Sequence, residues 1–471
     1  MARKKRRDFP TIEKMEILDA GSEGKAIGKF NERVVFVPYV VPGDVVDVKV
    51  HRQKKSWFEG RAIHFHKKSE KRIEAKCEHF GICGGCKWQN MSYDDQLFYK
   101  QKQVKDNLER IGKFPIPEIL PILQSERTFY YRNKMEFTFS NKRWLTEYSK
   151  GIDFDEQNMN ALGFHVPGLH TRVVDLNNCY LQEEPSNTMR LAIKKYADQK
   201  GLTFYNVKDM SGFLRNLLIR ITSTGQLMVI LVMNNDEREQ IKEIMDFIDS
   251  SFPGITSLNY VINPKVNDII TDLEIITYKG EPFIIEEMEG LQFKIGPVSF
   301  YQTNSLQAYE LYKVARAFAD LKGDELVYDL YTGTGTIANF IASKAKKVVG
   351  IEYVESAVLD AIENSKINNI KNTSFFAGDL AKVLNEEFTL ENGNPDVIIT
   401  DPPRAGMHEK VIKQILRIAP EKIVYVSCNP ATQARDVALM ADDYEVAKIQ
   451  PVDMFPQTHH VENVMLLVRK N

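Results

Sequence analysis

The sequence contains few cysteines, few tryptophans and no long apolar run. Its 471 residues include five cysteines and three tryptophans. No apolar stretch approaches the roughly 20 residues that a membrane helix needs, and no signal-like apolar segment follows the basic start. We therefore expect a cytoplasmic protein without a membrane partner. An odd number of cysteines in such a protein argues against disulfides and for metal binding or catalysis.

Excess charge is also small, because the formal net charge is only −2 at pH 7. It is unevenly distributed, however: residues 1–110 hold 24 Lys and Arg against 16 Asp and Glu, whereas the remainder is acidic. The N-terminal part is therefore expected to favour a polyanion. The basic residues Arg3–Arg7 lie in a predicted disordered tail, residues 1–9, and the alternative is that this tail is merely solvated.

The next segment, residues 10–66, contains short apolar runs rich in β-branched residues. These runs are residues 15–18, 33–37, 44–50 and 59–63, separated by turn signals at 21–24 and 42–43. About five short strands at this spacing predict a small closed barrel. Nearby Lys, Arg and Trp57 favour an OB-like nucleic-acid-binding barrel, and a purely structural barrel is the alternative.

Three cysteines then occur within ten residues, Cys77, Cys83 and Cys86, and a fourth, Cys179, follows about ninety residues later. Three clustered thiols and one remote thiol can form a four-thiolate site, and we favour an iron-sulfur cluster. Four-cysteine zinc sites more often consist of two Cys-x-x-Cys pairs, so zinc is the second choice. Four reduced, unligated cysteines are the third.

The middle of the chain, residues 67–290, is predicted to be a β-rich α+β domain. Apolar residues at helical spacing over about 93–111, ending at Gly112, indicate an amphipathic linking helix. Beyond it we expect strands at 130–139, 214–222, 226–233 and 270–278 and helices at 183–199 and 236–252. This pattern by itself indicates no function.

The last part, residues 291–471, alternates apolar β runs with helices. The runs cover residues 325–330, 347–352, 373–377, 396–400 and 422–426. Each is followed by glycine, acidic or cysteine residues, which predicts an open α/β sheet with its ligand beyond the carboxyl ends of the strands.

A glycine turn after the first of these runs predicts a nucleoside cofactor. Gly333 and Gly335 allow the backbone to approach a ligand closely, and Glu352 at the end of the next run can accept both hydroxyls of a ribose. A dinucleotide is the alternative, but the third glycine of its fingerprint is absent. With Asp379 and Asp401 at further strand ends, S-adenosylmethionine is the better cofactor.

A cysteine after the last run predicts covalent chemistry. Carbon 5 of uracil becomes nucleophilic only when a thiolate adds at carbon 6, and Cys428 is suited to that role. Glu462 is the candidate base that removes the carbon-5 proton. Arg404 stands where methyltransferases acting on exocyclic amines often have tyrosine, so amine methylation loses support. A buried cysteine at a strand end, without a chemical role, is the alternative.

These motifs together resemble the RNA uracil-5-methyltransferases over essentially the full chain. The resemblance is carried by the four cysteines, residues 300–304, 329–335, 401–406, 427–430 and 460–462. It is greatest with the iron-sulfur branch that methylates 23S ribosomal RNA. It implies an α/β protein with an N-terminal OB-like TRAM β-barrel, a central α+β iron-sulfur domain and a C-terminal Rossmann-like SAM-dependent methyltransferase domain.

The resemblance also implies roles for individual residues. Cys428 would be the nucleophile and Glu462 the base. The residues that would bind S-adenosylmethionine are Gln302, Tyr331, Glu352, Asp379 and Asp401, and those that would hold a [4Fe-4S] cluster are Cys77, Cys83, Cys86 and Cys179. Asp379 and Thr336 stand where a related enzyme has asparagine. We expect a monomer that forms 5-methyluridine in 23S rRNA; a tRNA methyltransferase and an RNA-binding protein with dispensable methyl transfer are the alternatives.

Overall fold

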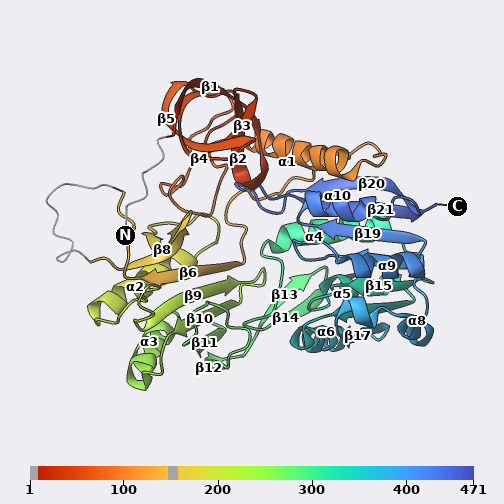
Figure 1. Cartoon of the computed structure of the whole chain (residues 1–471). Coiled ribbons are helices and arrows are strands. Elements are labelled where there is room, and N and C mark those ends of the chain that lie inside the picture. Colours follow the sequence, from red (N-terminus) through yellow and green to blue (C-terminus); the bar gives the residue numbers. More distant parts are fainter. Residues whose placement is uncertain (1–8, 147–157, 471) are drawn as a thin grey trace, which may run out of the picture.

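The computed structural model describes residues 9–146 and 158–470 (Figure 1). It consists of a small barrel, a mostly antiparallel central sheet and a mostly parallel C-terminal sheet, and the helix α1 runs from the barrel along the C-terminal part. The basic stretch Arg3–Arg7 lies outside the described residues, so its predicted contact with a polyanion is not addressed. No helix within the described ranges is long and apolar enough to cross a membrane.

The predicted five-stranded barrel is confirmed, with the strand order β1-β2-β3-β5-β4. Its strands are β1 (Thr11–Ala20), β2 (Lys25–Phe30), β3 (Arg33–Pro38), β4 (Val45–Gln53) and β5 (Trp57–Lys67). Residues of alternating burial point their apolar side chains into the barrel core. Strand β2 was not among the predicted runs because its inward residues include Ala26 and Gly28, whose small side chains give little apolar signal.

The predicted linking helix is also present, as α1 (Tyr93–Asn107), followed by a π-helical turn (Leu108–Gly112). Ser92 caps the helix, since its side chain accepts a hydrogen bond from the Asp95 N–H. Val104 and Leu108 are fully buried in a core shared with the C-terminal domain. The helix therefore connects the barrel to the C-terminal sheet by packing as well as by sequence.

The central sheet has seven strands in the order β12-β11-β10-β9-β6-β7-β8. They are β6 (Lys134–Ser140), β7 (Ala161–Val166), β8 (Leu169–Asp175), β9 (Leu214–Ile221), β10 (Leu227–Met233), β11 (Ser257–Ile262) and β12 (Ile275–Gly280). The helices are α2 (Ser186–Gln199) and α3 (Arg238–Ser251). Two predicted strands began too early: Tyr130 has φ 55 and turns the chain before β6, and β12 starts only at Ile275.

The C-terminal sheet has the order β17-β16-β15-β18-β19-β21-β20. Its strands are β15 (Leu326–Leu330), β16 (Lys347–Glu352), β17 (Thr373–Ala377), β18 (Val397–Thr400), β19 (Lys422–Ser427), β20 (Tyr444–Val452) and β21 (Glu462–Arg469). A hairpin of β13 (Ile284–Met288) and β14 (Leu291–Ile295) precedes it. The first five strands are parallel, whereas β21 is antiparallel to both of its neighbours.

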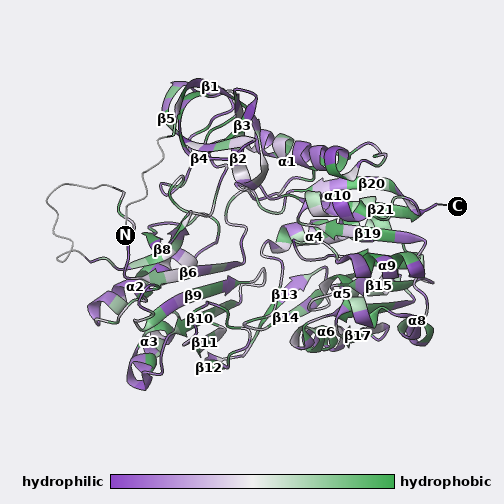
Figure 2. Cartoon of the chain, in the orientation of Figure 1, coloured by the Kyte–Doolittle hydropathy of each residue, from purple (hydrophilic) through white to green (hydrophobic). Residues whose placement is uncertain are grey.

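Helices cover both faces of this sheet, so its strands are apolar on both sides (Figures 1 and 2). They are α4 (Ser305–Ala319), α5 (Thr336–Ile341), α6 (Glu355–Ile367), α7 (Leu380–Val383), α8 (Glu386–Asn392), α9 (Glu409–Ile418) and α10 (Pro430–Ala438). In β19, Val424 and Val426 belong to one core and Ile423 and Tyr425 to the other. This two-sided burial explains the continuous apolar runs of the sequence.

Candidate active site

A tight turn at the end of β15 carries the two glycines. Tyr331, Gly333 and Gly335 all have positive φ, at 63°, 55° and 74°. Glu352, at the end of the neighbouring strand β16, receives the N–H of Gly333 on Oε2 at 3.1 Å and the N–H of Val354 on Oε1 at 3.0 Å. The acidic strand end predicted from the sequence therefore lies directly against the glycine turn.

Two carboxyl groups lie behind this turn at the ends of adjacent strands. Asp329 is fully buried in β15 and accepts a hydrogen bond from Thr332 Oγ1 at 2.5 Å. Burial raises the pKa of Asp329 to about 7. Burial, and then the charge of Asp329, raise the pKa of Asp401 to about 7 as well. Two acids in a poorly solvated site favour a cationic ligand, because a positive charge would stabilise their ionised forms.

Tyr331, Asp379 and Gln302 lie around the same edge. Burial, and then the charges of Asp436, Asp379 and Glu352, raise the pKa of Tyr331 to about 12. Asp379 caps α7 by accepting the Ala381 N–H at 3.0 Å. The segment that contains Gln302 reaches the glycine turn through Thr334 Oγ1, which donates to the Phe300 carbonyl at 3.4 Å.

Cys428 and Glu462 are brought together by the register of two antiparallel strands. Strand β19 pairs with β21 so that Ser427 is opposite Asn463. Cys428 directly follows β19 and Glu462 is the first residue of β21, so continuation of this register places them opposite each other at the strand ends. Their proximity also shows in the effect of the Glu462 charge on the Cys428 thiol. Cys428 is half-buried and Glu462 is buried.

The surroundings of Cys428 and Glu462 oppose ionisation of both groups. Burial, and then the charges of Glu462 and Asp401, raise the pKa of Cys428 to about 12, whereas Arg404 lowers it. Burial, and then Asp401, raise the pKa of Glu462 well above its ordinary value. The backbone of Arg404 is held beside the start of α10, because its carbonyl accepts Asn429 Nδ2 at 3.1 Å. Additional positive charge is needed before thiolate and carboxylate can coexist here.

The loop between β20 and β21 leads to Glu462 and is anchored to distant parts of the chain. Lys100 of α1 forms an ion pair with Asp453 at 2.5 Å, and both side chains are completely buried. The Gln457 carbonyl accepts the N–H groups of Lys87 and Trp88 at 2.9 and 3.0 Å. Sequence reasoning missed this anchoring, since partners more than 350 residues apart leave no local pattern.

The four remaining cysteines line one cavity between the loop of residues 77–89 and the central sheet. Burial raises the pKa of Cys83 to about 11 and that of Cys86 to about 12, and in both cases the Cys179 thiolate adds to the increase. Burial also raises the pKa of Cys77 and of Cys179. The structure thus brings the predicted ligand set together. No described group of three or more His, Cys, Asp or Glu is arranged to hold a single metal ion.

The sheet order, with antiparallel β21 inserted between β19 and β20, and the glycine turn at the carboxyl edge define an S-adenosylmethionine-dependent methyltransferase. Comparison with known proteins makes the assignment more specific. The TRAM domain model matches residues 13–63, and the model of the tRNA (uracil-5-)-methyltransferase family matches residues 257–470. An uncharacterized RNA methyltransferase of Bacteroides thetaiotaomicron is 57% identical over 95% of this chain and 99% of its own. The chain belongs to the RNA uracil-5-methyltransferase family.

Two further relatives cover almost the whole chain. An uncharacterized RNA methyltransferase of Porphyromonas gingivalis is 52% identical over 97% of this chain and 99% of its own. The crystal structure of Pyrococcus abyssi tRNA (uracil-54, C5)-methyltransferase in complex with S-adenosyl-L-homocysteine is similar with a TM-score of 0.74 and 28% identity, and covers 96% of this chain and 100% of its own. The likeness extends across the barrel, the central sheet and the C-terminal sheet.

Proposed function

We propose that this protein methylates carbon 5 of a uridine in 23S rRNA, with Cys428 as the nucleophile and Glu462 as the general base. The observation that carries the proposal is the opposition of these two residues at the ends of β19 and β21, beside Asp401 and the glycine turn. A thiol and a carboxyl group at the same edge of the sheet are the two groups that a pyrimidine needs for substitution at carbon 5.

In the proposed reaction the Cys428 thiolate adds to carbon 6 and converts the ring into an enolate. Carbon 5 then attacks the methyl group of S-adenosylmethionine, and S-adenosylhomocysteine leaves. The Glu462 carboxylate removes the proton from carbon 5, the carbon 5 to carbon 6 double bond forms again, and the thiolate is expelled. The carbon-5 proton on Glu462 is the one net proton released, and it passes to solvent so that the carboxylate is restored. The thiolate takes up one proton, which replaces the proton that the thiol lost at the start.

Ionisation of the Cys428 thiol is favoured by positive charge, and two sources would supply it. Arg404 already lowers the pKa of Cys428. Bound S-adenosylmethionine would place a sulfonium near Asp401, whose pKa of about 7 makes it ready to ionise. We infer that cofactor binding lowers the pKa of Cys428 and of Glu462, and so couples activation of the nucleophile to the presence of the methyl donor.

The proposed cofactor residues have distinct tasks. Glu352 would receive the ribose hydroxyls on the acceptor positions that its hydrogen bonds from the Gly333 and Val354 N–H groups do not use. Tyr331 and Asp379 flank the same edge and would contact the adenosine part. Gln302 and Asp401 would contact the remaining part of the cofactor. The half-buried carboxyl of Asp401, whose pKa is raised to about 7, favours the cationic end of the cofactor.

We further propose that Cys77, Cys83, Cys86 and Cys179 hold a [4Fe-4S] cluster. The four thiols fit this group because they line a common, largely apolar cavity, and a cluster separates its thiolate ligands more widely than a single ion does. A zinc ion would require all sulfurs at about 2.3 Å from one point. Four irons and four sulfides per protein purified without oxygen are expected; a stoichiometric zinc content would contradict the cluster.

Two RNA classes, 23S rRNA and tRNA, are candidate substrates. The spacing of the four cysteines favours 23S rRNA, because the iron-sulfur branch of the family acts there. A tRNA is the second candidate, favoured by the likeness to the Pyrococcus abyssi enzyme over nearly the whole chain. The test supplies labelled S-adenosylmethionine with unmodified 23S rRNA or tRNA transcripts and measures 5-methyluridine. Product in 23S rRNA alone supports the first candidate, product in tRNA alone the second, and product in neither contradicts both.

A further inference from the structure

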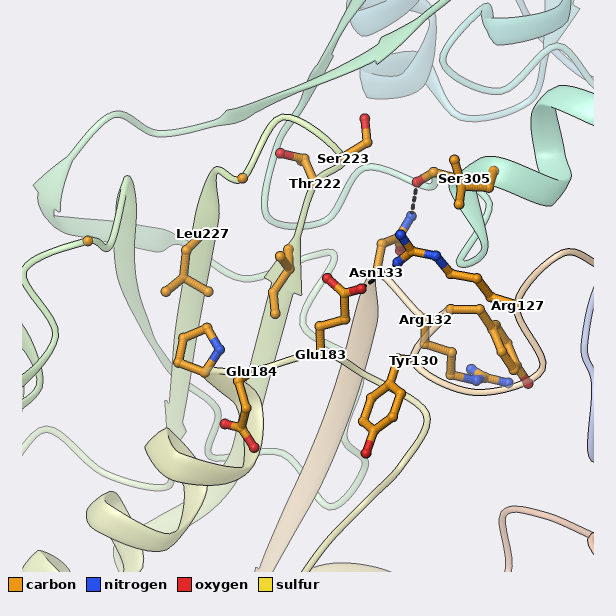
Figure 3. A pocket seen from close by; sticks show the side chains of 16 residues that line it. Arg127, Tyr130, Arg132, Asn133, Glu183, Glu184, Thr222, Ser223, Leu227 and Ser305 are labelled. Atoms are coloured by element: carbon orange, nitrogen blue, oxygen red, sulfur yellow. Dashed lines mark hydrogen bonds and ion pairs between the residues drawn. The ribbon is translucent and has the colours of Figure 1, made fainter. Parts of the chain in front are cut away.

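A second cavity, of about 520 Å³, lies between the central sheet and the start of α4 (Figure 3). Arg127, Tyr130, Asn133, Glu183 and Ser305 are among its lining residues. Its size is within the 300–1,000 Å³ of typical small-ligand sites. None of the residues to which we have assigned chemistry lines it, so its polar groups and the half-buried Tyr130 ring require another explanation.

Asn133 in the cavity lining forms hydrogen bonds with the segment that carries Gln302. Asn133 Nδ2 donates to the Gln302 carbonyl and to Ser305 Oγ, each at 2.8 Å, and the Asn133 N–H donates to the Thr303 carbonyl at 2.8 Å. Figure 3 shows the contact between Asn133 and Ser305 at the upper side of the cavity. A ligand in the cavity would therefore lie one side-chain layer from the proposed cofactor site.

Arg132 connects the cavity with the loop between β20 and β21. It lines the cavity, and its guanidinium lies over the ring of Phe455 at 5.4 Å. Burial lowers the pKa of His460 to about 4, and the charge of Arg132 contributes to this shift. Within the part of the chain that the structure describes, Arg132 has no carboxylate partner, and its Nε is buried without a hydrogen bond. Its charge also lowers the pKa of Cys179, so Arg132 contributes positive charge to both the cavity and the cysteine cluster.

One wall of the cavity continues into three aromatic rings around a lysine. The ammonium of Lys76 lies 4.9 Å from the ring centres of Phe129 and Tyr130 and 4.8 Å from that of Tyr180. Tyr180 meets the other two rings edge to face, at 78° and 72°. All three rings are half-buried and Lys76 is exposed. We call these four residues and the cavity the aromatic subsite.

The energies favour exchange of the lysine for a nucleobase. A cation over a ring at an exposed site contributes only about 0.5–1 kcal/mol. A base stacked on an aromatic ring contributes about 1–3 kcal/mol and does so for any base. Lys76 can leave the rings at low cost and keep its charge for the phosphate of the same nucleotide. The Arg127 guanidinium, paired with Glu183 at the cavity mouth, is a second cation within the site.

We propose that the aromatic subsite binds a nucleotide next to the target uridine in the RNA strand, with its base on the Tyr130 and Tyr180 rings and its phosphate at Lys76. The inference rests on the proposed function and adds to it. A uridine that leaves its stack to reach Cys428 costs a few kcal/mol, and a neighbouring base held on these rings offsets part of that cost.

The first test measures the binding of a fluorescent 12-nucleotide single-stranded oligouridine by anisotropy. Tyr130→Ala and Lys76→Ala are each expected to weaken binding about 5-fold or more. Phe98→Ala is the matched control, because Phe98 on α1 is also an aromatic ring with a lysine over it but lies outside the subsite. Phe98 is 58% exposed, and the Lys71 ammonium lies 5.5 Å from its ring centre. Affinity for S-adenosylmethionine should be unchanged in all three. Equal effects of Tyr130→Ala and Phe98→Ala overturn the proposal.

The second test locates the nucleotide. An oligouridine containing 4-thiouridine is cross-linked to the full-length wild-type protein by long-wavelength light, and the modified peptides are mapped by mass spectrometry. We expect adducts on the peptides that contain Tyr130 or Tyr180; cross-links confined to the barrel overturn the proposal. Neither test requires methyl transfer, so a protein that binds oligouridine here but makes no 5-methyluridine contradicts the proposed function and leaves the subsite standing.

Discussion

Cys428 and Glu462 face each other across the ends of β19 and β21, because the antiparallel pairing of Ser427 with Asn463 leaves them as the next opposed pair. They come from strands whose intervening connection includes α10 and β20. A strand shifted by one residue would turn one of the two side chains to the other face of the sheet. The register of a single strand pair therefore sets the geometry of the proposed reaction.

Substitution of Cys428 and of Glu462 should block the reaction at different steps. Glu462→Gln keeps the shape of the side chain but cannot accept the carbon-5 proton, so turnover should fall by about 10²–10⁴ while a protein–RNA adduct accumulates on ordinary RNA. Cys428→Ala should form no adduct. Glu445→Gln, at an exposed carboxylate on β20, is the control and should behave as the wild type. Adduct mobility on denaturing gels and 5-methyluridine yield measure both effects; absence of adduct with Glu462→Gln argues against the assigned base.

The pH dependence of cofactor binding follows from the raised pKa of Asp401. With a pKa of about 7, this carboxyl is ionised above neutrality and becomes neutral as the pH falls, which removes a negative charge that would face the sulfonium. Affinity for S-adenosylmethionine should therefore decrease from pH 8 to pH 6. Calorimetry should show a smaller decrease in Asp401→Asn. S-Adenosylhomocysteine, which lacks the sulfonium charge, should vary little; equal pH profiles for the two ligands would refute the explanation.

Much of this architecture could be predicted because parallel strands buried on both faces are continuous apolar runs. The expected limits of β16 and β17 coincide with the observed ones, and the polar residues that follow the strands lie at one edge, as expected. The barrel was also predicted, except for β2, whose small inward residues weaken the alternating pattern.

The features that could not be predicted from the sequence depend on contacts between residues far apart in the chain. The insertion of β21 between β19 and β20 has no local signal, so the sequence predicted Glu462 as a base without predicting its opposition to Cys428. The aromatic subsite combines Lys76 with rings from two later segments, and each of these residues is unremarkable by itself. The buried pair of Lys100 and Asp453 is equally non-local. Tertiary packing alone creates these features.

Loss of the buried ion pair should destabilise the protein strongly. Burial lowers the pKa of Lys100 despite the opposing effect of Asp453, and Lys100→Met leaves that carboxylate buried without its partner. The expected cost is about 3–5 kcal/mol of unfolding free energy. Lys102→Met on the same helix breaks the pairs of a 32% exposed lysine with Asp19 and Asp106 and should cost about 1 kcal/mol or less. Thermal or denaturant unfolding compares the two; similar losses would contradict the role of the buried pair.

The two glycines of the turn should differ in their tolerance of alanine. Both have positive φ, so each substitution carries backbone strain of about 1–2 kcal/mol. A Cβ at Gly333 would meet no atom within 4 Å, whereas a Cβ at Gly335 would lie 2.8 Å from the Cβ of Ala361. Gly335→Ala should therefore lower the free energy of unfolding by a further 1 kcal/mol or more, about the cost of overpacking. Equal unfolding midpoints for the two variants would show that the close approach is relieved without cost.

The most direct test of the account is mass spectrometry of a covalent trap. Protein purified without oxygen is mixed with S-adenosylmethionine and 5-fluorouridine-substituted 23S rRNA or tRNA. Fluorine cannot leave carbon 5 as a proton does, so the wild-type protein should form a stalled adduct between the RNA and the peptide that contains Cys428. Cys428→Ala should form none. No adduct with either RNA, from protein shown to bind the cofactor, would contradict the covalent mechanism.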